Sequence, residues 1–397
     1  MGSSELALDG SASRGPATGH DASELSLSDA VDRDRLIASF LELLSIDSPT
    51  GHETEIGRLL ESRFAGLGCQ TSRDEVGNLV AVLPGTRAGT ILISTHMDTA
   101  GSDRGITPIV DDGLVRTDGS TILGADDKSG IACCLELLTL LRDHPAQPRP
   151  TIEFVVSVGE ERGLVGSRHL DVSRLKASHG FVLDTAGPIG SITYWTPTSV
   201  YLTMTFSGRK AHAGVEPEKG VSAIRMAAEA IAAMPLGRID AETVANIGTI
   251  AGGEARNIVP GSVVLEGMAR SHDQGKLDEQ VQAMREACEG AAARLGGRVE
   301  FTVEEIYRTY RIPEDAAPYR EAAAAIRSVG LTVVPRKSGG GTDANLFNAK
   351  GIACVALPTG MVDEHATTER ISIHDLVTAC RVLVAIATQL QHDGESS

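Results

Sequence analysis

An imidazole and a carboxylate stand two residues apart just after an apolar run of the chain. The run covers residues 90–94, and His96 and Asp98 follow it closely. In an extended chain, residues two apart point to the same side, so both side chains can reach one point. An imidazole with a carboxylate behind it is typical of a metal ligand and the group that orients it. An isolated pair of this kind is also common on protein surfaces, so the pair alone does not decide between the two interpretations.

Two adjacent aspartates, Asp126 and Asp127, stand at the start of an apolar stripe of helical spacing over residues 127–144. Aspartate is a favoured N-cap residue, so either side chain could simply cap the predicted helix. The alternative is that one of them faces a functional site. Their position at the start of the helix leaves both interpretations open.

Two adjacent glutamates, Glu160 and Glu161, follow the strand predicted at residues 151–158. Neighbouring residues of a strand face opposite sides of the sheet. Both glutamates can therefore reach one site only if the chain turns between the strand and the pair. Gly159 stands at that point, and glycine permits such a turn.

Asp184 and His365 add a carboxylate and a second imidazole after two further apolar runs. In open α/β sheets, sites form at the carboxyl ends of the strands, so these groups are predicted to lie along one rim. Two imidazoles and three carboxylates suit a pair of Zn²⁺ ions with one bridging carboxylate. The sequence has no H-E-x-x-H motif, which argues against a single-zinc protease site on a helix. The predicted set is His96, Asp126, Glu161, Asp184 and His365.

The elements that must position these groups alternate between helix and strand from about residue 29. Apolar strands that alternate with helices predict an α/β domain whose sheet is covered on both faces. The middle of the chain has the order β-α-β-β-α-β, which predicts a small ferredoxin-like domain inserted into the first. The α/β pattern then resumes, with a strand predicted at 331–335. The expected organisation is a flexible tail (1–28), a catalytic domain in two parts (29–196 and 313–397) and the inserted domain (197–312).

The composition argues against several classes of protein. The 397 residues include 53 acidic and 36 basic ones, and the formal net charge of −17 argues against nucleic acid or a membrane surface as a partner. No apolar run approaches the roughly 20 residues of a membrane helix. The six cysteines form no C-x-x-C pair, and residues 1–28 lack the features of a signal peptide. A cytoplasmic protein is therefore expected.

The chain resembles the peptidase T-like branch of the co-catalytic zinc metallopeptidases, which also include carboxypeptidase G, aminoacylase and succinyl-diaminopimelate desuccinylase. The stretches that support the resemblance span residues 94–373; they include ISTHMD, DGSTILGADDKSGIA, GEERGLVGS, GRKAHAGVEPEKGVSAI and SGGGTDANLF. As in that branch, the inserted domain follows Asp184 rather than preceding Asp126. The C-terminal histidine loop, DEHATTERISI, differs from that of peptidase T proper, so a strict tripeptide specificity does not follow.

The resemblance implies a role for each clustered residue. His96, Asp126 and Asp184 would hold one zinc ion of each subunit, and the second ion would be held by Asp126, Glu161 and His365. Asp98 would orient His96, and Glu160 would be the general base. Co²⁺ or Mn²⁺ are possible replacements for Zn²⁺.

The resemblance also assigns residues in and after the inserted domain, which would serve as a lid and as the contact of a homodimer. His212, otherwise an ordinary loop histidine, would reach the active site of the other subunit and donate to the oxyanion. Arg270, otherwise a solvated charge, would bind a substrate carboxylate, for which its planar donors are suited. Asn257 would assist as a nearby polar contact. Gly340, in a run of three glycines, is either part of a flexible turn or a point of backbone approach to the substrate.

These observations predict a di-zinc hydrolase that cleaves short peptides as an aminopeptidase. An amidohydrolase of the same fold acting on N-acyl amino acids or related amides is the alternative, because it would use the same catalytic residues. A binding protein that has lost its metals is a third possibility. It would lack the base or a ligand, and all of them are present here.

Overall fold

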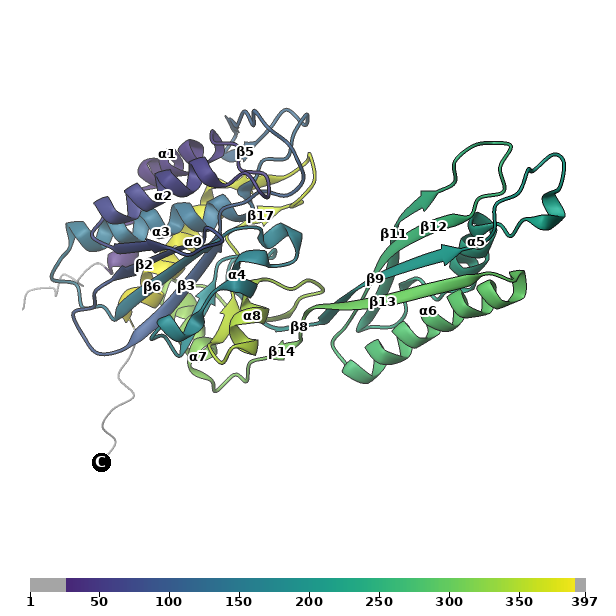
Figure 1. The fold of residues 1–397 in the computed structure, drawn as a ribbon. Coiled ribbons are helices and arrows are strands. Elements are labelled where there is room, and N and C mark those ends of the chain that lie inside the picture. Colours follow the sequence, from purple (N-terminus) through teal and green to yellow (C-terminus); the bar gives the residue numbers. More distant parts are fainter. Residues whose placement is uncertain (1–25, 390–397) are drawn as a thin grey trace, which may run out of the picture.

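The computed structural model describes residues 26–389 and has two lobes (Figure 1). Two connections join the lobes. One runs from β8 (Ser191–Thr196) to β9 (Thr198–Ser207), and the other from β13 (Arg298–Tyr307) to β14 (Tyr310–Arg311). The chain thus leaves the larger lobe and returns to it close to the boundaries expected at residues 197 and 312.

The larger lobe is built on a nine-stranded mixed sheet, which confirms the α/β class. Its order is β1-β2-β6-β3-β7-β16-β8-β14, with β15 also paired to β8. The central strands β3, β6, β7 and β16 are parallel. They are buried along almost their whole length, as expected for strands covered on both faces. The bounds are β1 (Gln70–Arg73), β2 (Leu79–Leu83), β3 (Thr90–His96), β6 (Thr151–Ser157), β7 (His179–Val182), β15 (Val334–Lys337) and β16 (Ala353–Ala356).

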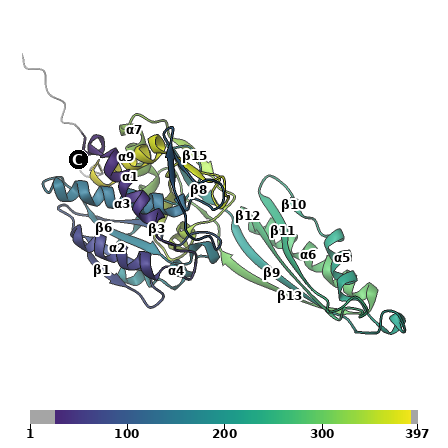
Figure 2. The same cartoon turned by 90° about the horizontal axis from the view of Figure 1, so that it is seen from above.

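Helices pack around this sheet (Figures 1 and 2). The 3₁₀ helix η1 (Leu27–Ala30) contacts α9, and α3 contacts β3, α1 and α9. Every residue of α3 up to Leu141 is buried, which fits a helix that lies inside the lobe. The helices are α1 (Arg33–Leu44), α2 (Thr54–Gly66), α3 (Ala125–Asp143), α4 (Val165–His169), α7 (Ala317–Ser328), α8 (Asp343–Ala349) and α9 (Ile373–Gln389).

Most of the expected N-terminal tail, residues 1–25, lies outside the described residues. The last part of it does not behave as a tail, because Leu27 and Ser28 are buried where η1 packs on α9. Among the described residues, no helix is both long and apolar enough to cross a membrane.

A small four-stranded sheet holds the segment that carries His365. Its order is β17-β18-β5-β4, so it pairs a hairpin near residue 112 with the chain near residue 370. His365 lies in the loop between β17 and β18, and the sheet anchors both ends of that loop. The bounds are β4 (Ile109–Asp111), β5 (Leu114–Arg116), β17 (Met361–Val362) and β18 (Arg370–Ser372).

The smaller lobe is the expected β-α-β-β-α-β domain, which we call the lid. Its sheet has the order β10-β11-β12-β9-β13, and α5 and α6 lie along one face of it (Figure 2). The apolar side chains of the strands point to those helices and form a core separate from that of the larger lobe. No helix of residues 26–389 covers the opposite face of the lid sheet. The remaining bounds are α5 (Ala223–Ala233), β10 (Gly237–Arg238), β11 (Thr243–Gly252), β12 (Ser262–Ser271) and α6 (Gln274–Leu295).

Candidate active site

His96 is the last residue of β3, and its ring contacts groups on both sides. Nε2 lies 3.0 Å from Asp126 Oδ1, while Nδ1 lies 3.0 Å from the backbone oxygen of Asp98 and 3.4 Å from its carboxylate. The Asp98 carboxylate is buried and accepts from the Thr50 hydroxyl and from the backbone N–H of Glu160. Asp98 therefore lies behind the His96 ring, as the spacing predicted, and also fixes the turn that follows β6.

Asp126 is at the centre of the cluster. Its second oxygen, Oδ2, lies 3.2 Å from Nε2 of His365, so one carboxylate contacts both imidazoles. His365 Nε2 also lies 3.0 Å from Glu161 Oε2. Asp127 accepts from the backbone N–H groups of His96 and Gly130 and is not among the side chains that could share a metal ion. The structure thus separates the two aspartates, with Asp126 in the site and Asp127 bonded to the start of α3.

The turn expected at Gly159 is present and brings both glutamates to the rim. Gly159 has a φ of 61°, and the 3₁₀ helix η2 (Glu160–Arg162) follows it directly. Two groups of side chains can each place one ligand atom within 4.8 Å of the others. They are His96 with Asp126 and Glu161, and His96 with Glu160 and Asp184. Both glutamates therefore offer an oxygen to the same cluster.

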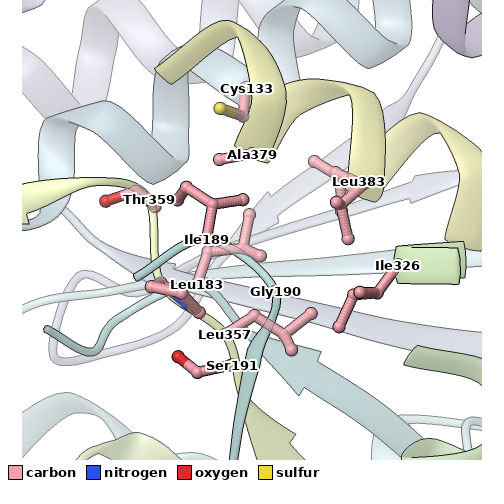
Figure 3. A pocket seen from close by; sticks show the side chains of 12 residues that line it. Cys133, Leu183, Ile189, Gly190, Ser191, Ile326, Leu357, Thr359, Ala379 and Leu383 are labelled. Atoms are coloured by element: carbon pink, nitrogen blue, oxygen red, sulfur yellow. The ribbon is translucent and has the colours of Figure 1, made fainter. Parts of the chain in front are cut away.

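Asp184 follows β7, and the residue before it packs among apolar side chains. The preceding residue, Leu183, lines a small pocket against Leu357, Cys133 and Leu383 (Figure 3). This pocket has a volume of about 10 Å³, no more than a single water molecule needs. The side chains around Leu183 are therefore closely packed.

The two imidazoles balance part of the negative charge. Burial would raise the pKa of Asp126, but its hydrogen bonds with His365 and His96 outweigh burial and hold that pKa below its usual value. The same bond to Asp126 raises the pKa of His365 to about 11. Burial and the nearby Asp184 carboxylate raise the pKa of Glu160 well above its usual range. The cluster therefore attracts positive charge, which protons or metal ions can supply.

Two buried carboxylates that the sequence analysis missed support the cluster from outside. Glu369 accepts from the backbone N–H groups of Leu123, Gly124 and Asp126. Asp343, at the start of α8, accepts from the hydroxyls of Ser157 and Ser167. Neither residue follows an apolar strand-like run, which is the pattern that identified the other groups.

A cavity of about 410 Å³ opens over the cluster, between the larger lobe and the lid. Arg270 and Gly340 line it together with the clustered carboxylates, so the structure brings these two predicted residues to the site. Arg336 and Tyr307 also line it and were not predicted. The volume falls within the range of small-ligand sites.

His212 and Asn257 do not line this cavity. Both are exposed in the lid, where the N–H of Ala213 donates to the backbone oxygen of Asn257 over 2.8 Å. The two predicted residues thus lie close to each other but apart from the active-site cavity of their own chain.

The fold and the site together fit a hydrolase. The family model described as "Peptidase family M20/M25/M40" matches residues 92–389 of this chain. The chain belongs to this family.

Several relatives are similar over nearly the whole chain. The aminopeptidase PepT of Bacillus cereus is 40% identical, with a TM-score of 0.80, and the match covers 90% of this chain and 99% of that one. A tripeptidase of Staphylococcus aureus is 38% identical, with a TM-score of 0.85 and coverage of 90% and 98%. The uncharacterized protein YqjE of Bacillus subtilis is 42% identical over 365 residues, which are 90% of this chain and 98% of the relative.

The role of Glu369 can be tested by Glu369→Gln. An amide has one acceptor oxygen and would turn its NH₂ group toward a backbone N–H, so we expect the free energy of unfolding to fall by about 1–3 kcal/mol. Denaturant unfolding of the variant and of Glu218→Gln, at an exposed position of the lid, measures the difference. Equal stability of the two variants would contradict the assigned contact.

Proposed function

We propose that this chain is a di-zinc aminopeptidase that hydrolyses short peptides. The observation that supports it most is the arrangement around Asp126, whose two oxygens face the two imidazoles. Relatives named aminopeptidase PepT and tripeptidase, at 40% and 38% identity, favour short peptides over other amides. The six cysteines are all free and buried, which agrees with a cytoplasmic location.

The residues of the cluster fit divalent metal. Imidazole nitrogens and carboxylate oxygens are ligands that Zn²⁺ accepts. One oxygen of Glu161, Oε1, is buried without a hydrogen-bond partner, and a cation would supply one. We assign His96, Asp126 and Asp184 to one ion and Asp126, Glu161 and His365 to the other. Co²⁺ and Mn²⁺ accept the same kinds of ligand and remain possible replacements.

Zinc at such a site would polarise the scissile carbonyl and lower the pKa of water. In the proposed reaction, Glu160 removes the proton of the attacking water and delivers it to the leaving amine. The same carboxyl group thus acts first as a base and then as an acid. Asp98 holds the His96 ring and the backbone of Glu160 in place throughout.

The rest of the cavity would hold the peptide. Arg270 lines the same cavity as the carboxylate cluster, and we assign it to the substrate's carboxylate. Gly340 lies beside it and lets the substrate approach the backbone. A short peptide can then be held at both ends, with its scissile bond beside Glu160.

A substrate panel of di-, tri- and N-acyl peptides tests this function, with Glu160→Gln as the matched variant. We expect tripeptides to be cleaved fastest and Glu160→Gln to lose at least about 100-fold in kcat while both metals stay bound. Loss of a metal from this variant would make Glu160 a ligand instead of the base. Exclusive cleavage of N-acyl amino acids would establish the amidohydrolase alternative.

Metal content tests the assignment of Asp126. A bridging carboxylate serves both ions, so Asp126→Ala is expected to lose both metals, whereas Asp184→Ala mainly empties one site. Elemental analysis of the purified variants after equal exposure to zinc measures this difference. Full metal content in Asp126→Ala would show that another carboxylate forms the bridge.

We further propose that two chains join through their lids and complete each other's sites. Beyond its short pairing with β10, the outer edge of β11 has no neighbouring strand among the described residues. Pairing of two such edges across a two-fold axis would extend the sheet and cover both. The exposed His212 could then reach the partner's cavity and donate to the oxyanion, with Asn257 as a neighbouring polar contact.

Mixing His212→Ala with Glu160→Ala tests this shared site. Each variant alone should be nearly inactive. After subunit exchange, one site in each mixed dimer has both residues, so about a quarter of normal activity should return from random mixing. Failure to recover activity in proven mixed dimers would place His212 in its own chain's site or outside catalysis.

A further inference from the structure

A second cavity opens beside the active-site cavity at Arg270. Its volume is about 390 Å³, and it shares Arg270, Ser338 and Gly339 with the active-site cavity. We call it the basic cavity, because its lining also includes Arg238, His272 and Lys337. The carboxylate cluster does not line it, so this cavity is not part of the reacting centre.

One wall of the basic cavity is the helix-free face of the lid sheet. Arg238 of β10 pairs with Val244 of β11, which in turn pairs with Arg270 of β12. Residues in register across a sheet share a face, so both arginines are on the same side. Their neighbours Ala245 and Ala269 are buried in the lid core on the other side.

The other wall comes from the larger lobe at the end of β15. Nζ of Lys337 lies 3.8 Å from the centre of the Trp195 ring, and the ring of His272 meets the same indole edge-on at 5.2 Å. The N–H of Ser338 donates to the backbone oxygen of Trp195. The Trp195 ring therefore contacts both Lys337 of the larger lobe and His272 of the lid.

Arg238, Arg270 and Lys337 have no carboxylate partner inside the basic cavity. Its one acidic lining residue, Glu242, is bonded to Lys276 at 2.9 Å. Within residues 26–389, no ion pair joins Arg238, Arg270 or Lys337 to a carboxylate. Both ring nitrogens of His272 and Nε of Arg270 are buried without a hydrogen-bond partner. Buried donors without partners are costly, and a chain of net charge −17 has ample carboxylates to pair with them.

We propose that the basic cavity binds the acidic side chain of an aspartate or glutamate at the carboxyl-terminal end of the substrate. This inference rests on the proposed function, which places the substrate's own carboxylate at Arg270. Because Arg270, Ser338 and Gly339 line both cavities, the basic cavity lies directly beside the position proposed for that terminal residue. Guanidinium and ammonium groups form their strongest hydrogen bonds with carboxylates, so the site selects charge rather than size.

The test compares two tripeptides of nearly equal shape, Ala-Ala-Glu and Ala-Ala-Gln, on the metal-loaded enzyme. We expect kcat/KM to favour the glutamate peptide by about tenfold or more, since charge-assisted bonds replace neutral ones. The double variant Arg238→Gln with Lys337→Gln should bring this ratio close to one. The measured quantity is the ratio of kcat/KM for the two peptides, so a loss of activity that affects both peptides equally does not change it. Arg298→Gln, an exposed charge at the far end of the lid sheet, is the control that should keep the full ratio.

The outcomes separate this inference from the proposed function. Cleavage of both peptides at equal rates by the unmodified enzyme would overturn the acidic subsite and leave the aminopeptidase function intact. A preference that survives in the double variant would also overturn it, because the selecting groups would lie elsewhere. If neither peptide is cleaved, the proposed function fails, and calorimetric binding of the two peptides still decides the subsite. Tighter binding of the glutamate peptide, lost in the double variant, would support it, and equal binding would overturn it.

Discussion

The constraint on which this structure depends is the close approach of buried carboxylates at one rim of the main sheet. Asp98, Asp126 and Asp184 are all buried there, and two glutamates reach the same place. Like charges at this separation repel strongly in a medium of low dielectric constant. The chain holds them together with two imidazoles and with backbone N–H groups, and one glutamate oxygen is left without a partner. Divalent cations would balance this charge more completely than protons on the imidazoles, which is why the cluster fits metal.

Both lobes contribute charged groups to the cavity. The carboxylates come from the larger lobe, and the cations are Arg270 of the lid and Arg336 of β15. A short peptide has an ammonium group at one end and a carboxylate at the other. With Arg270 assigned to the substrate's carboxylate as proposed, the terminal carboxylate would lie at the lid and the scissile bond at the cluster.

Local patterns in the sequence were sufficient for the rim and for the order of elements. His96, Asp126, Glu161 and Asp184 each follow an apolar run or open a helix, and the carboxyl ends of parallel strands meet at one edge. Residues whose role depends on a distant partner could not be found in this way. Glu369 bonds to the segment before α3, more than 240 positions away. The strand expected at 331–335 lies instead at Val334–Lys337, because pairing with β8, and not its own alternation, sets its register. The same pairing places Lys337 beside Trp195.

The carboxylate cluster and the basic cavity are lined by different residues. Substrate specificity could therefore change while the catalytic residues stay the same. The clustered carboxylates are locked by buried contacts such as those of Asp98 and Glu369, so a change there disturbs several partners at once. Arg238 and Lys337, in contrast, have few partners within the described chain and stand on an exposed strand and at a strand end. Substitution at such positions alters the charge offered to a substrate at little cost in stability. The lid face and the end of β15 are therefore where substrate preference could change while the rim stays the same.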